Sequence, residues 1–184
     1  MIKDVYRNSR VVNSGKYLTT VNELTDQIPA LRPKVLWEAA LEIVKAGNFN
    51  CDKLVCEEDK GAPLGTTVSL ITGLPLAMAR WYSYSLPEEV TTKIECEYYN
   101  GNLYLNGVES KDKITIIDDT ISTGGTIISL INALKQKDVE IVDIIALVEK
   151  INSNGVERVY KETGIKVKTI MKIKVDDNKV HVVE

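Results

Sequence analysis

The chain has 184 residues, 44% of them hydrophobic, and a formal net charge of −3 at pH 7. This length and apolar content suit one well-buried α/β domain and are too small for two ordinary domains. The slightly acidic balance, without a basic run, gives no electrostatic argument for a nucleic-acid partner.

Cysteine and histidine usage narrows the class of protein further. Cys51, Cys56 and Cys96 are odd in number and lack CxxC spacing, which indicates reduced thiols rather than a disulfide framework or a zinc site. The single histidine, His181, argues against His-dependent triads and His-rich metal sites. Without a signal peptide or an apolar run of membrane length, we expect a soluble, cytoplasmic protein with no membrane partner.

The first half of the chain alternates predicted strands and helices. Pro33 suits the first position of a helix, and Gly47 and Gly73 suit helix ends. A charged turn with Lys60 and Gly61 follows one strand and leads into a helix, which is where open α/β sheets bind ligands. The predicted elements are a strand at 17–21, a helix at 34–46, a strand at 53–56, a helix that continues the turn 57–65 to about 72, and a strand at 74–80 that ends at Arg80.

Residues 81–106 form a long connection. Apolar residues alternate from Ile94 onward and again up to Leu105, which indicates a two-stranded ribbon. We place its turn at Asn100-Gly101, because this dipeptide is a strong hairpin signal. An extended hairpin over a ligand site predicts a mobile lid that excludes water; the alternative is an ordinary exposed hairpin with aromatic cross-strand pairs.

The stretch 114–126 carries the main functional pattern. An apolar run ends in Asp118-Asp119, and hydroxyls and glycines then lead to Thr126 and an apolar helical pattern. Glycines let backbone N–H groups approach an anion, and the helix N-terminus adds partial positive charge. The two acids would repel an adjacent phosphate, so they suit hydroxyls or a metal further along the ligand. No Gly-Lys-Ser or Gly-Lys-Thr of a Walker loop occurs.

The last third of the chain continues the alternation. Its predicted elements are a strand at 141–148 that leads into Glu149-Lys150, a short helix that starts at 153–155 and stops at Gly164, a strand at 166–175, a turn at 176–178 and a final strand at 180–182. Strands that alternate with helices predict an α/β fold with a parallel twisted sheet flanked by helices.

The stretch 114–126 resembles the binding motif for phosphoribosyl pyrophosphate (PRPP) of the type I phosphoribosyltransferases, in which an apolar strand leads through two acids to a Thr-Gly-Gly-Thr-type loop. In that family the acid pair holds the ribose hydroxyls and the loop holds the 5-phosphate. The resemblance therefore implies catalytic and metal-binding roles for Asp118 and Asp119. The implied PRPP-binding residues are Asp118, Asp119, Thr120, Ser122, Thr123, Gly124, Gly125 and Thr126.

The resemblance covers roughly residues 53–175 and implies the family's organisation for the whole chain. We expect a Rossmann-like fold, Mg²⁺ as cofactor, PRPP and a purine base as substrates, and a homodimer. The implied arrangement is a single domain over 1–184, with a small hood from 1–32 and about 150–184 and a flexible loop at 81–106.

The pyrophosphate loop of the family is similar to the turn at 57–65. There Lys60-Gly61 stand where adenine phosphoribosyltransferases have Arg-Gly, and Arg80 matches an arginine that contacts pyrophosphate. The resemblance thus implies pyrophosphate binding by Lys60, Gly61 and Arg80. The acids at 57–59 depart from the family pattern, because carboxylates beside a diphosphate weaken its binding unless they point away or meet Mg²⁺.

Two further pairs of residues resemble functional positions. Glu97-Tyr98 is similar to the glutamate-tyrosine pair of the catalytic loop in adenine phosphoribosyltransferases, which implies a catalytic role for Glu97, with a structural role equally open. Glu149 and Lys150 lie where related enzymes contact the purine, which implies base binding.

The implied reaction is transfer of 5-phosphoribose from PRPP to a purine, with adenine as an alternative to the slightly favoured hypoxanthine and guanine and with orotate well behind. Ser122 stands where mammalian-type hypoxanthine-guanine enzymes have an aspartate, so the general base is unassigned. A non-catalytic PRPP-sensing regulator is a further alternative, although residues 1–32 lack a basic DNA-binding face. A flavodoxin-like binding domain would leave the acid pair unexplained.

Overall fold

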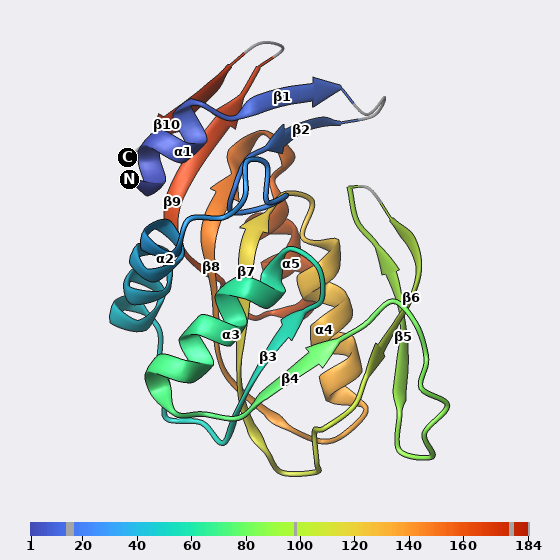
Figure 1. Cartoon of the computed structure of the whole chain (residues 1–184). Coiled ribbons are helices and arrows are strands. Elements are labelled where there is room, and N and C mark those ends of the chain that lie inside the picture. The colour runs from blue at the N-terminus through green and yellow to red at the C-terminus, as the bar shows by residue number, and fades with distance from the viewer. Residues whose placement is uncertain (14–16, 98, 177–178, 184) are drawn as a thin grey trace.

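The fold is built on a six-stranded sheet with the strand order β10-β9-β8-β7-β3-β4, and Figure 1 shows helices on both of its sides. The computed structural model describes residues 1–13, 17–97, 99–176 and 179–183. The sheet strands are β3 (Lys53–Glu57), β4 (Leu76–Ala79), β7 (Lys113–Ile121), β8 (Glu140–Lys150), β9 (Lys168–Val175) and β10 (Val180–Val183). Only the β9–β10 pair within this sheet is antiparallel. This arrangement confirms the predicted fold class.

Several helices begin or end at the proline and glycine residues that the sequence analysis identified as boundaries. Pro33 is the first residue of α2, and Gly73 and Gly164 directly follow α3 and α5. Two elements of the first 13 residues were not predicted: a helix and the strand that follows it. The helices are α1 (Ile2–Arg7), α2 (Pro33–Ala46), α3 (Gly61–Thr72), α4 (Gly125–Lys135) and α5 (Gly155–Thr163), with a 3₁₀ turn η1 (Ile151–Ser153) before α5. In the described part of the chain, no helix has the length and apolarity needed to cross a membrane.

The central strand β7 separates two apolar cores. Ile116 packs into the core beneath α4, whereas its neighbour Ile117 packs into the core beneath α1, α2 and α3. Successive residues of a strand point to opposite faces, so an unbroken apolar run is what a strand covered on both faces needs. The end of β7 is thereby fixed from both sides, which suits a strand that carries functional side chains.

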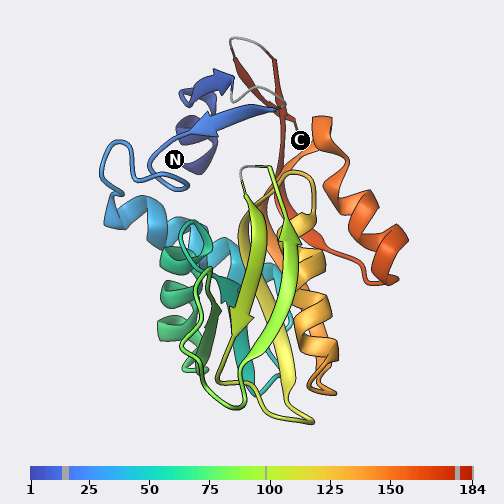
Figure 2. The ribbon, with the colours of Figure 1, turned by 90° about the vertical axis from the view of Figure 1, so that its right-hand side faces the viewer.

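The connection between β4 and β7 is a hairpin of β5 (Val90–Glu95) and β6 (Asn100–Leu105), which lies beside α4 (Figures 1 and 2). The two strands are joined between Glu95 and Asn100, where the Cys96 N–H donates to the Tyr99 carbonyl over 2.9 Å. The predicted turn at Asn100-Gly101 is therefore wrong, because both residues lie in β6 and pair with Glu95 and Ile94.

Burial explains the register of this hairpin. The observed register places Val90 opposite Leu105 and puts Ile94 on the same face, and all three are buried in the core with α4. A turn at residues 100–101 would instead place Val90 opposite Lys111. The apolar face thus decides the register against the local turn signal. The mobility of residues 81–106 stays a prediction, and Tyr98 and the turn residues 177–178 lie outside the described residues.

A smaller antiparallel ribbon of β1 (Arg10–Asn13) and β2 (Leu18–Val21) stands at the upper end of the sheet in Figure 1, near α1 and β10. The predicted strand at 17–21 corresponds to β2. Residues 22–32 lead from this ribbon to α2. The assignment of the whole chain to one domain, with this segment as part of a hood, stays a prediction.

Candidate active site

A cavity that is partly open to solvent lies at the carboxyl ends of β3, β7 and β8. The carboxyl ends of parallel strands are the usual ligand-binding edge of an open α/β sheet. The structure brings most of the predicted site residues together there. Those that line the cavity are Lys60, Glu97, Asp118, Asp119, Thr120, Ser122, Thr123, Gly124, Gly125, Thr126 and Lys150.

The acid pair is buried at the end of β7. Asp118 and Asp119 are each only 5% exposed, and the Asp119 backbone N–H donates to Asp118 Oδ1 over 3.0 Å. Burial, Asp119 and Glu57 raise the pKa of Asp118 well above its ordinary value. Burial also raises the pKa of Asp119, although the positive charge of Lys60 opposes this shift. Asp119 Oδ2 is buried without a hydrogen-bond partner among the described residues. A ligand that supplies donors or positive charge would satisfy it.

A third buried carboxyl, Glu57, completes this acidic cluster. It is the last residue of β3, is 2% exposed and accepts a hydrogen bond from Trp81 Nε1. Burial, followed by the charge of Asp119, raises the pKa of Glu57 to about 8. Sequence analysis treated Glu57 only as an obstacle to a diphosphate. Its position at the end of a strand beside β7 was the signal that could have identified it.

The loop that precedes α4 is enclosed by main chain on two sides. Gly124 has a φ of 78°, and a Cβ atom there would lie 2.7 Å from the Gly155 carbonyl oxygen. A Cβ atom on Gly125 would lie 1.8 Å from the carbonyl oxygen of Glu95, at the tip of the β5–β6 hairpin. Both positions therefore require glycine. Since the loop opens a helix and lines the cavity, it offers N–H groups and a helix dipole to an anion.

Hydroxyls and one arginine support this loop. Ser122 Oγ lies 3.1 Å from Ser153 Oγ, and Arg158 Nη1 donates to the Thr123 carbonyl over 3.2 Å. Thr123 and Thr126 line the cavity directly. The arrangement suits a phosphate, whose oxygens accept hydrogen bonds from hydroxyl and backbone donors.

The predicted pyrophosphate-binding residues divide between the cavity and its surroundings. Lys60 lines the cavity and forms an ion pair with Asp26, with Nζ 2.9 Å from Oδ1. Burial disfavours the charged form of Lys60, but Asp26 outweighs it, so the pKa of Lys60 is raised. Gly61 does not line the cavity; a Cβ there would lie 3.7 Å from Asp118 Oδ1, so it packs behind the acid pair.

Arg80 lies outside the cavity lining. Its guanidinium forms an ion pair with Glu58 at 2.8 Å and lies 5.8 and 5.6 Å from the ring centres of Tyr82 and Tyr84. Glu58 is thus paired with an arginine at the end of the neighbouring strand β4. The structure therefore does not place the Arg80 guanidinium in the cavity with the acid pair.

The two predicted base-binding residues point to different surroundings, as adjacent strand residues do. Lys150 is 5% exposed at its side chain and pairs with Glu97, with Nζ 2.7 Å from Oε1. Glu97 also accepts a hydrogen bond from Thr19 Oγ1 over 3.0 Å. Glu149 instead faces Lys172, at 3.3 Å, and does not line the cavity.

Four threonine and cysteine residues of the cavity were missed by sequence analysis in addition to Glu57. They are Thr19, Thr20, Thr25 and Cys96. Thr19, Thr20 and Thr25 belong to the N-terminal segment, and the sequence did not indicate which side of the sheet this segment would face. Cys96 was assigned to a ribbon without a known orientation.

The described residues contain no group of three or more His, Cys, Asp or Glu side chains arranged for a metal ion. Mg²⁺ commonly takes one or two carboxylates from a protein and completes its shell with water and substrate phosphates. Asp118 and Asp119 therefore fit a Mg²⁺ ion that arrives with a phosphorylated substrate, and the unpartnered Asp119 Oδ2 is a suitable ligand atom.

One strand of the mostly parallel sheet ends in two buried acids, and a Thr-Gly-Gly-Thr loop follows them. This arrangement is typical of one class of protein, the phosphoribosyltransferases. The profile of the phosphoribosyl transferase domain matches residues 25–183, and the chain belongs to this family. The hypoxanthine/guanine phosphoribosyltransferase of Methanocaldococcus sp. (strain FS406-22) is 44% identical over 181 residues, which cover 98% of this chain and 91% of that protein. The protein of the same name from Methanothermus fervidus is 43% identical over 183 residues, 99% of this chain and 96% of its own.

Solved structures agree on the fold. The adenine phosphoribosyltransferase of Thermoanaerobacter pseudethanolicus superposes with a TM-score of 0.76 at 20% identity, over 94% of this chain and 99% of that one. The enzyme from Giardia lamblia, solved with 9-deazaadenine, gives a TM-score of 0.74 at 16% identity, over 93% and 97% of the two chains.

Proposed function

We propose that this phosphoribosyltransferase transfers the 5-phosphoribosyl group of PRPP to a 6-oxopurine, hypoxanthine or guanine, and releases pyrophosphate. The observation that carries the proposal is the buried pair Asp118–Asp119, followed directly by a glycine-enclosed loop at the start of α4. The names of the relatives at 44% and 43% identity support the choice of base.

In the proposed complex, the ribose of PRPP lies over the acid pair and its 5-phosphate in the loop from Ser122 to Thr126. The carboxylates of Asp118 and Asp119 accept hydrogen bonds from the ribose hydroxyls, and Lys60 donates to the diphosphate. Asp118 and Asp119 would hold Mg²⁺, whose positive charge would neutralise the diphosphate.

The reaction breaks the bond between C1 of the ribose and the diphosphate oxygen and forms a bond from C1 to a nitrogen of the base. The chain's residues contribute mainly orientation and electrostatic stabilisation, because both reactants must be held in line at C1. Glu97 lies at the hairpin tip that lines the cavity and is our candidate for the group that accepts the proton lost by the base.

Lys150 supports a 6-oxopurine over adenine. An ammonium group only donates hydrogen bonds, so it satisfies the exocyclic oxygen of hypoxanthine or guanine and opposes the exocyclic amino group of adenine. We retain Lys150 and not Glu149 as the base-binding residue, since Glu149 is paired with Lys172 away from the cavity.

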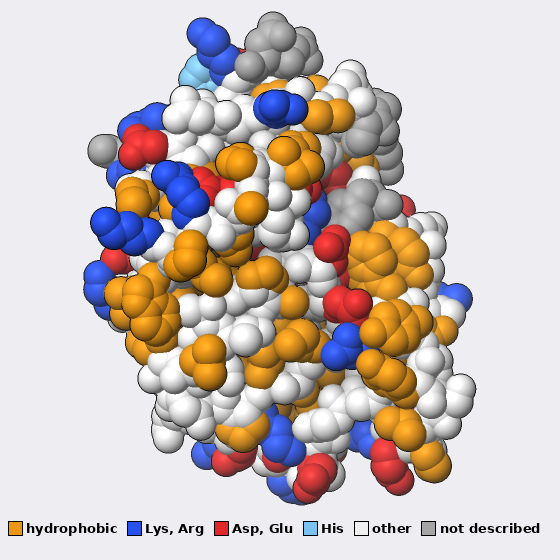
Figure 3. Space-filling model, in the orientation of Figure 1, with side chains coloured by type: hydrophobic (Ala, Val, Ile, Leu, Met, Phe, Trp, Pro, Cys, Tyr) orange, Lys and Arg blue, Asp and Glu red, His pale blue; other side chains and the backbone are white. Residues whose placement is uncertain are grey.

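We also propose that the protein works in the cytoplasm as a homodimer, with one domain per chain and a hood formed by 1–32 and about 150–184. Trp37 and Leu41 lie one helical turn apart on α2 and remain 52% and 42% exposed. Figure 3 shows hydrophobic side chains gathered at the left of the molecule, over α2 and α3. Covering such a patch with a second copy would remove apolar area from water.

The test is a nucleotide-formation assay with PRPP and Mg²⁺ against hypoxanthine, guanine, xanthine, adenine and orotate in parallel. We expect turnover of hypoxanthine and guanine. Preferential use of adenine would reject the assignment of the base. If no base reacts, PRPP binding measured by calorimetry would favour the PRPP-sensing alternative, and its absence would reject the site.

A further inference from the structure

The N-terminal helix α1 sends one side chain to the back of the candidate active site. Tyr6 is 0% exposed, and its hydroxyl oxygen lies 3.1 Å from Thr120 Oγ1. Thr120 directly follows the acid pair on β7 and lines the cavity. The phenol is close enough to Asp119, Asp26 and Asp118 for their charges to raise its pKa, in addition to the larger effect of burial.

Either hydroxyl of the Tyr6–Thr120 pair can donate to the other, because each carries one proton and also accepts. Thr120 is adjacent in the sequence to Asp119, and both residues line the cavity. Replacing either hydroxyl by an apolar group would remove this hydrogen bond behind the cavity.

We propose that Tyr6 is a positioning residue of the PRPP site. Its hydroxyl bonds to the Thr120 hydroxyl and so fixes this cavity side chain directly beside the acid pair. The inference rests on the proposed function, because it assigns the cavity around Thr120 to PRPP. It adds a residue 114 positions away from Thr120 to the group that determines how PRPP is bound.

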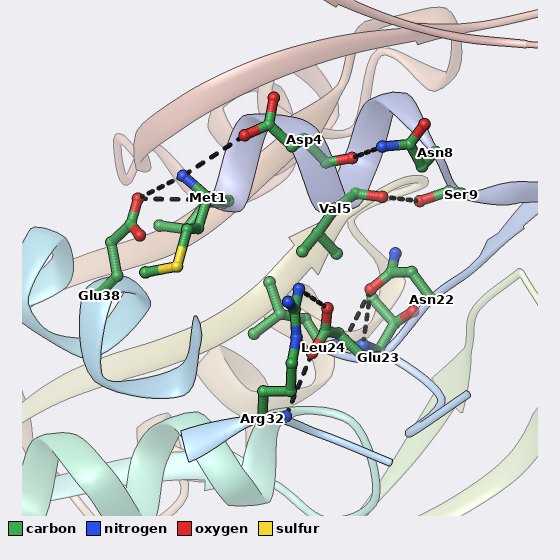
Figure 4. A network of polar contacts seen from close by, with 12 residues as sticks. Met1, Asp4, Val5, Asn8, Ser9, Asn22, Glu23, Leu24, Arg32 and Glu38 are labelled. Atoms are coloured by element: carbon green, nitrogen blue, oxygen red, sulfur yellow. Dashed lines mark hydrogen bonds and ion pairs between the residues drawn. The ribbon is translucent and has the colours of Figure 1, made fainter. Parts of the chain in front are cut away.

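The surroundings of α1 suit this role. Ile2, Val5 and Tyr6 are buried in the core that also contains residues of α2. Figure 4 shows the amino group of Met1 beside Glu38 of α2, and its nitrogen lies 3.2 Å from Oε1. Helix α1 is thus attached to the body of the protein, so the Tyr6 hydroxyl has a defined position relative to β7.

The loop after β2 provides a second link between the same segment and the cavity. Asn22 Oδ1 accepts hydrogen bonds from the backbone N–H groups of Leu24 and Thr25, at 2.8 and 3.2 Å (Figure 4). This turn places Thr25 in the cavity lining and Asp26 beside Lys60. Residues 1–32 therefore support both the ribose end and the diphosphate end of the proposed PRPP site.

The experiment compares Tyr6→Phe with Tyr160→Phe as a matched control, since Tyr160 is half exposed on α5. Removing one supporting hydrogen bond should raise the KM for PRPP about tenfold in Tyr6→Phe. The KM for hypoxanthine and the Tm should stay close to those of the wild type, and Tyr160→Phe should change none of these quantities.

Substitutions of Thr120 test the same hydrogen bond independently. Thr120→Val should raise the KM for PRPP to a similar extent, whereas Thr120→Ser, which keeps the hydroxyl, should largely retain the wild-type value. In the double variant Tyr6→Phe/Thr120→Val the two effects should not multiply, because both changes break the same hydrogen bond. If Tyr6→Phe fails to fold, the contrast between valine and serine at position 120 decides.

Three results would overturn the inference. They are a wild-type KM for PRPP in Tyr6→Phe, a parallel change in the KM of both substrates with a lowered Tm, or equal behaviour of valine and serine at position 120. An inactive wild-type protein would count against the proposed function instead. In that case the Kd for PRPP of the same variants, measured by calorimetry, applies the same test to the inference.

Discussion

The buried carboxyl of Glu57 makes a direct prediction about how stability depends on pH. The perturbation is Glu57→Gln, which removes the ionisable group and keeps nearly the same shape. A glutamine side-chain oxygen can still accept the hydrogen bond that Trp81 Nε1 donates to Glu57. The substitution therefore changes mainly the charge of the acidic cluster.

The size of the effect follows from the two pKa values of Glu57, 4.5 as its ordinary value and about 8 in the folded protein. The folded protein holds this proton more tightly than the unfolded chain, so the contribution to stability is complete below pH 4.5 and is lost as the pH rises to about 8. A difference of about 3.5 between the two pKa values corresponds to roughly 5 kcal/mol at high pH. The glutamine side chain of the variant cannot ionise, so the free energy of unfolding of the variant does not fall in this way as the pH rises.

The measurement is the free energy of unfolding in urea between pH 4 and pH 9, on ligand-free protein without divalent ions. The wild type and Glu57→Gln should be about equally stable near pH 4, and the variant should become the more stable protein as the pH rises, by roughly 5 kcal/mol above pH 8. Glu109→Gln, at an exposed position, should follow the wild type at every pH.

Parallel pH profiles of wild type and Glu57→Gln would refute the reasoning, because they would mean that Glu57 titrates equally in the folded and unfolded states. Asp118 and Asp119 also have raised pKa values, and both remain in the variant. The difference between the two profiles therefore reports on Glu57, together with the part of the raised Asp118 pKa that the Glu57 charge causes.

Three further predictions concern the cavity. Asp119→Asn should lower kcat/KM for PRPP by about 10- to 150-fold, because a charged hydrogen bond to the ribose is worth about 1.5–3 kcal/mol; steady-state kinetics with full retained activity would remove the ribose assignment. Gly125→Ala should displace the hairpin tip, since the new Cβ would lie 1.8 Å from the Glu95 carbonyl oxygen, and should weaken PRPP binding in calorimetry. Wild-type affinity would show that the tip is not packed there. Lys150→Met combined with Glu97→Gln, which avoids leaving a buried unpaired charge, should lose preference for hypoxanthine over adenine in a competition assay; an unchanged ratio would exclude Lys150 as the selecting group.

The centre of the site was predictable because its chemistry is contiguous in the chain. The residues from Asp118 to Thr126 lie at the end of one buried strand and in the loop that follows it. Strand–turn–helix order then determines which way the loop faces. The same local logic identified Pro33 and Gly73 as helix boundaries.

The parts of the fold and of the site that could not be predicted depend on contacts between segments that are distant in the sequence. Thr19 lines the cavity and Tyr6 reaches Thr120 only because the N-terminal segment packs over the end of the sheet, and no local pattern marks that packing. The difference between Glu149 and Lys150 is one of strand parity, which sequence analysis did not resolve. At Asn100-Gly101 the local turn signal was overridden, because burial of the hairpin's apolar face sets the register.

The glycine-enclosed loop has a consequence for how such a catalyst can diversify. Gly124 and Gly125 meet the main chain of Gly155 and Glu95, so exchanging side chains around them leaves the shape of the proposed phosphate-binding loop unchanged. Elsewhere the cavity is lined by side chains such as Lys150 and residues of the N-terminal segment. On the proposed assignment, new base preferences can therefore evolve by exchanging these side chains, while the loop proposed to bind the sugar phosphate is inherited unchanged.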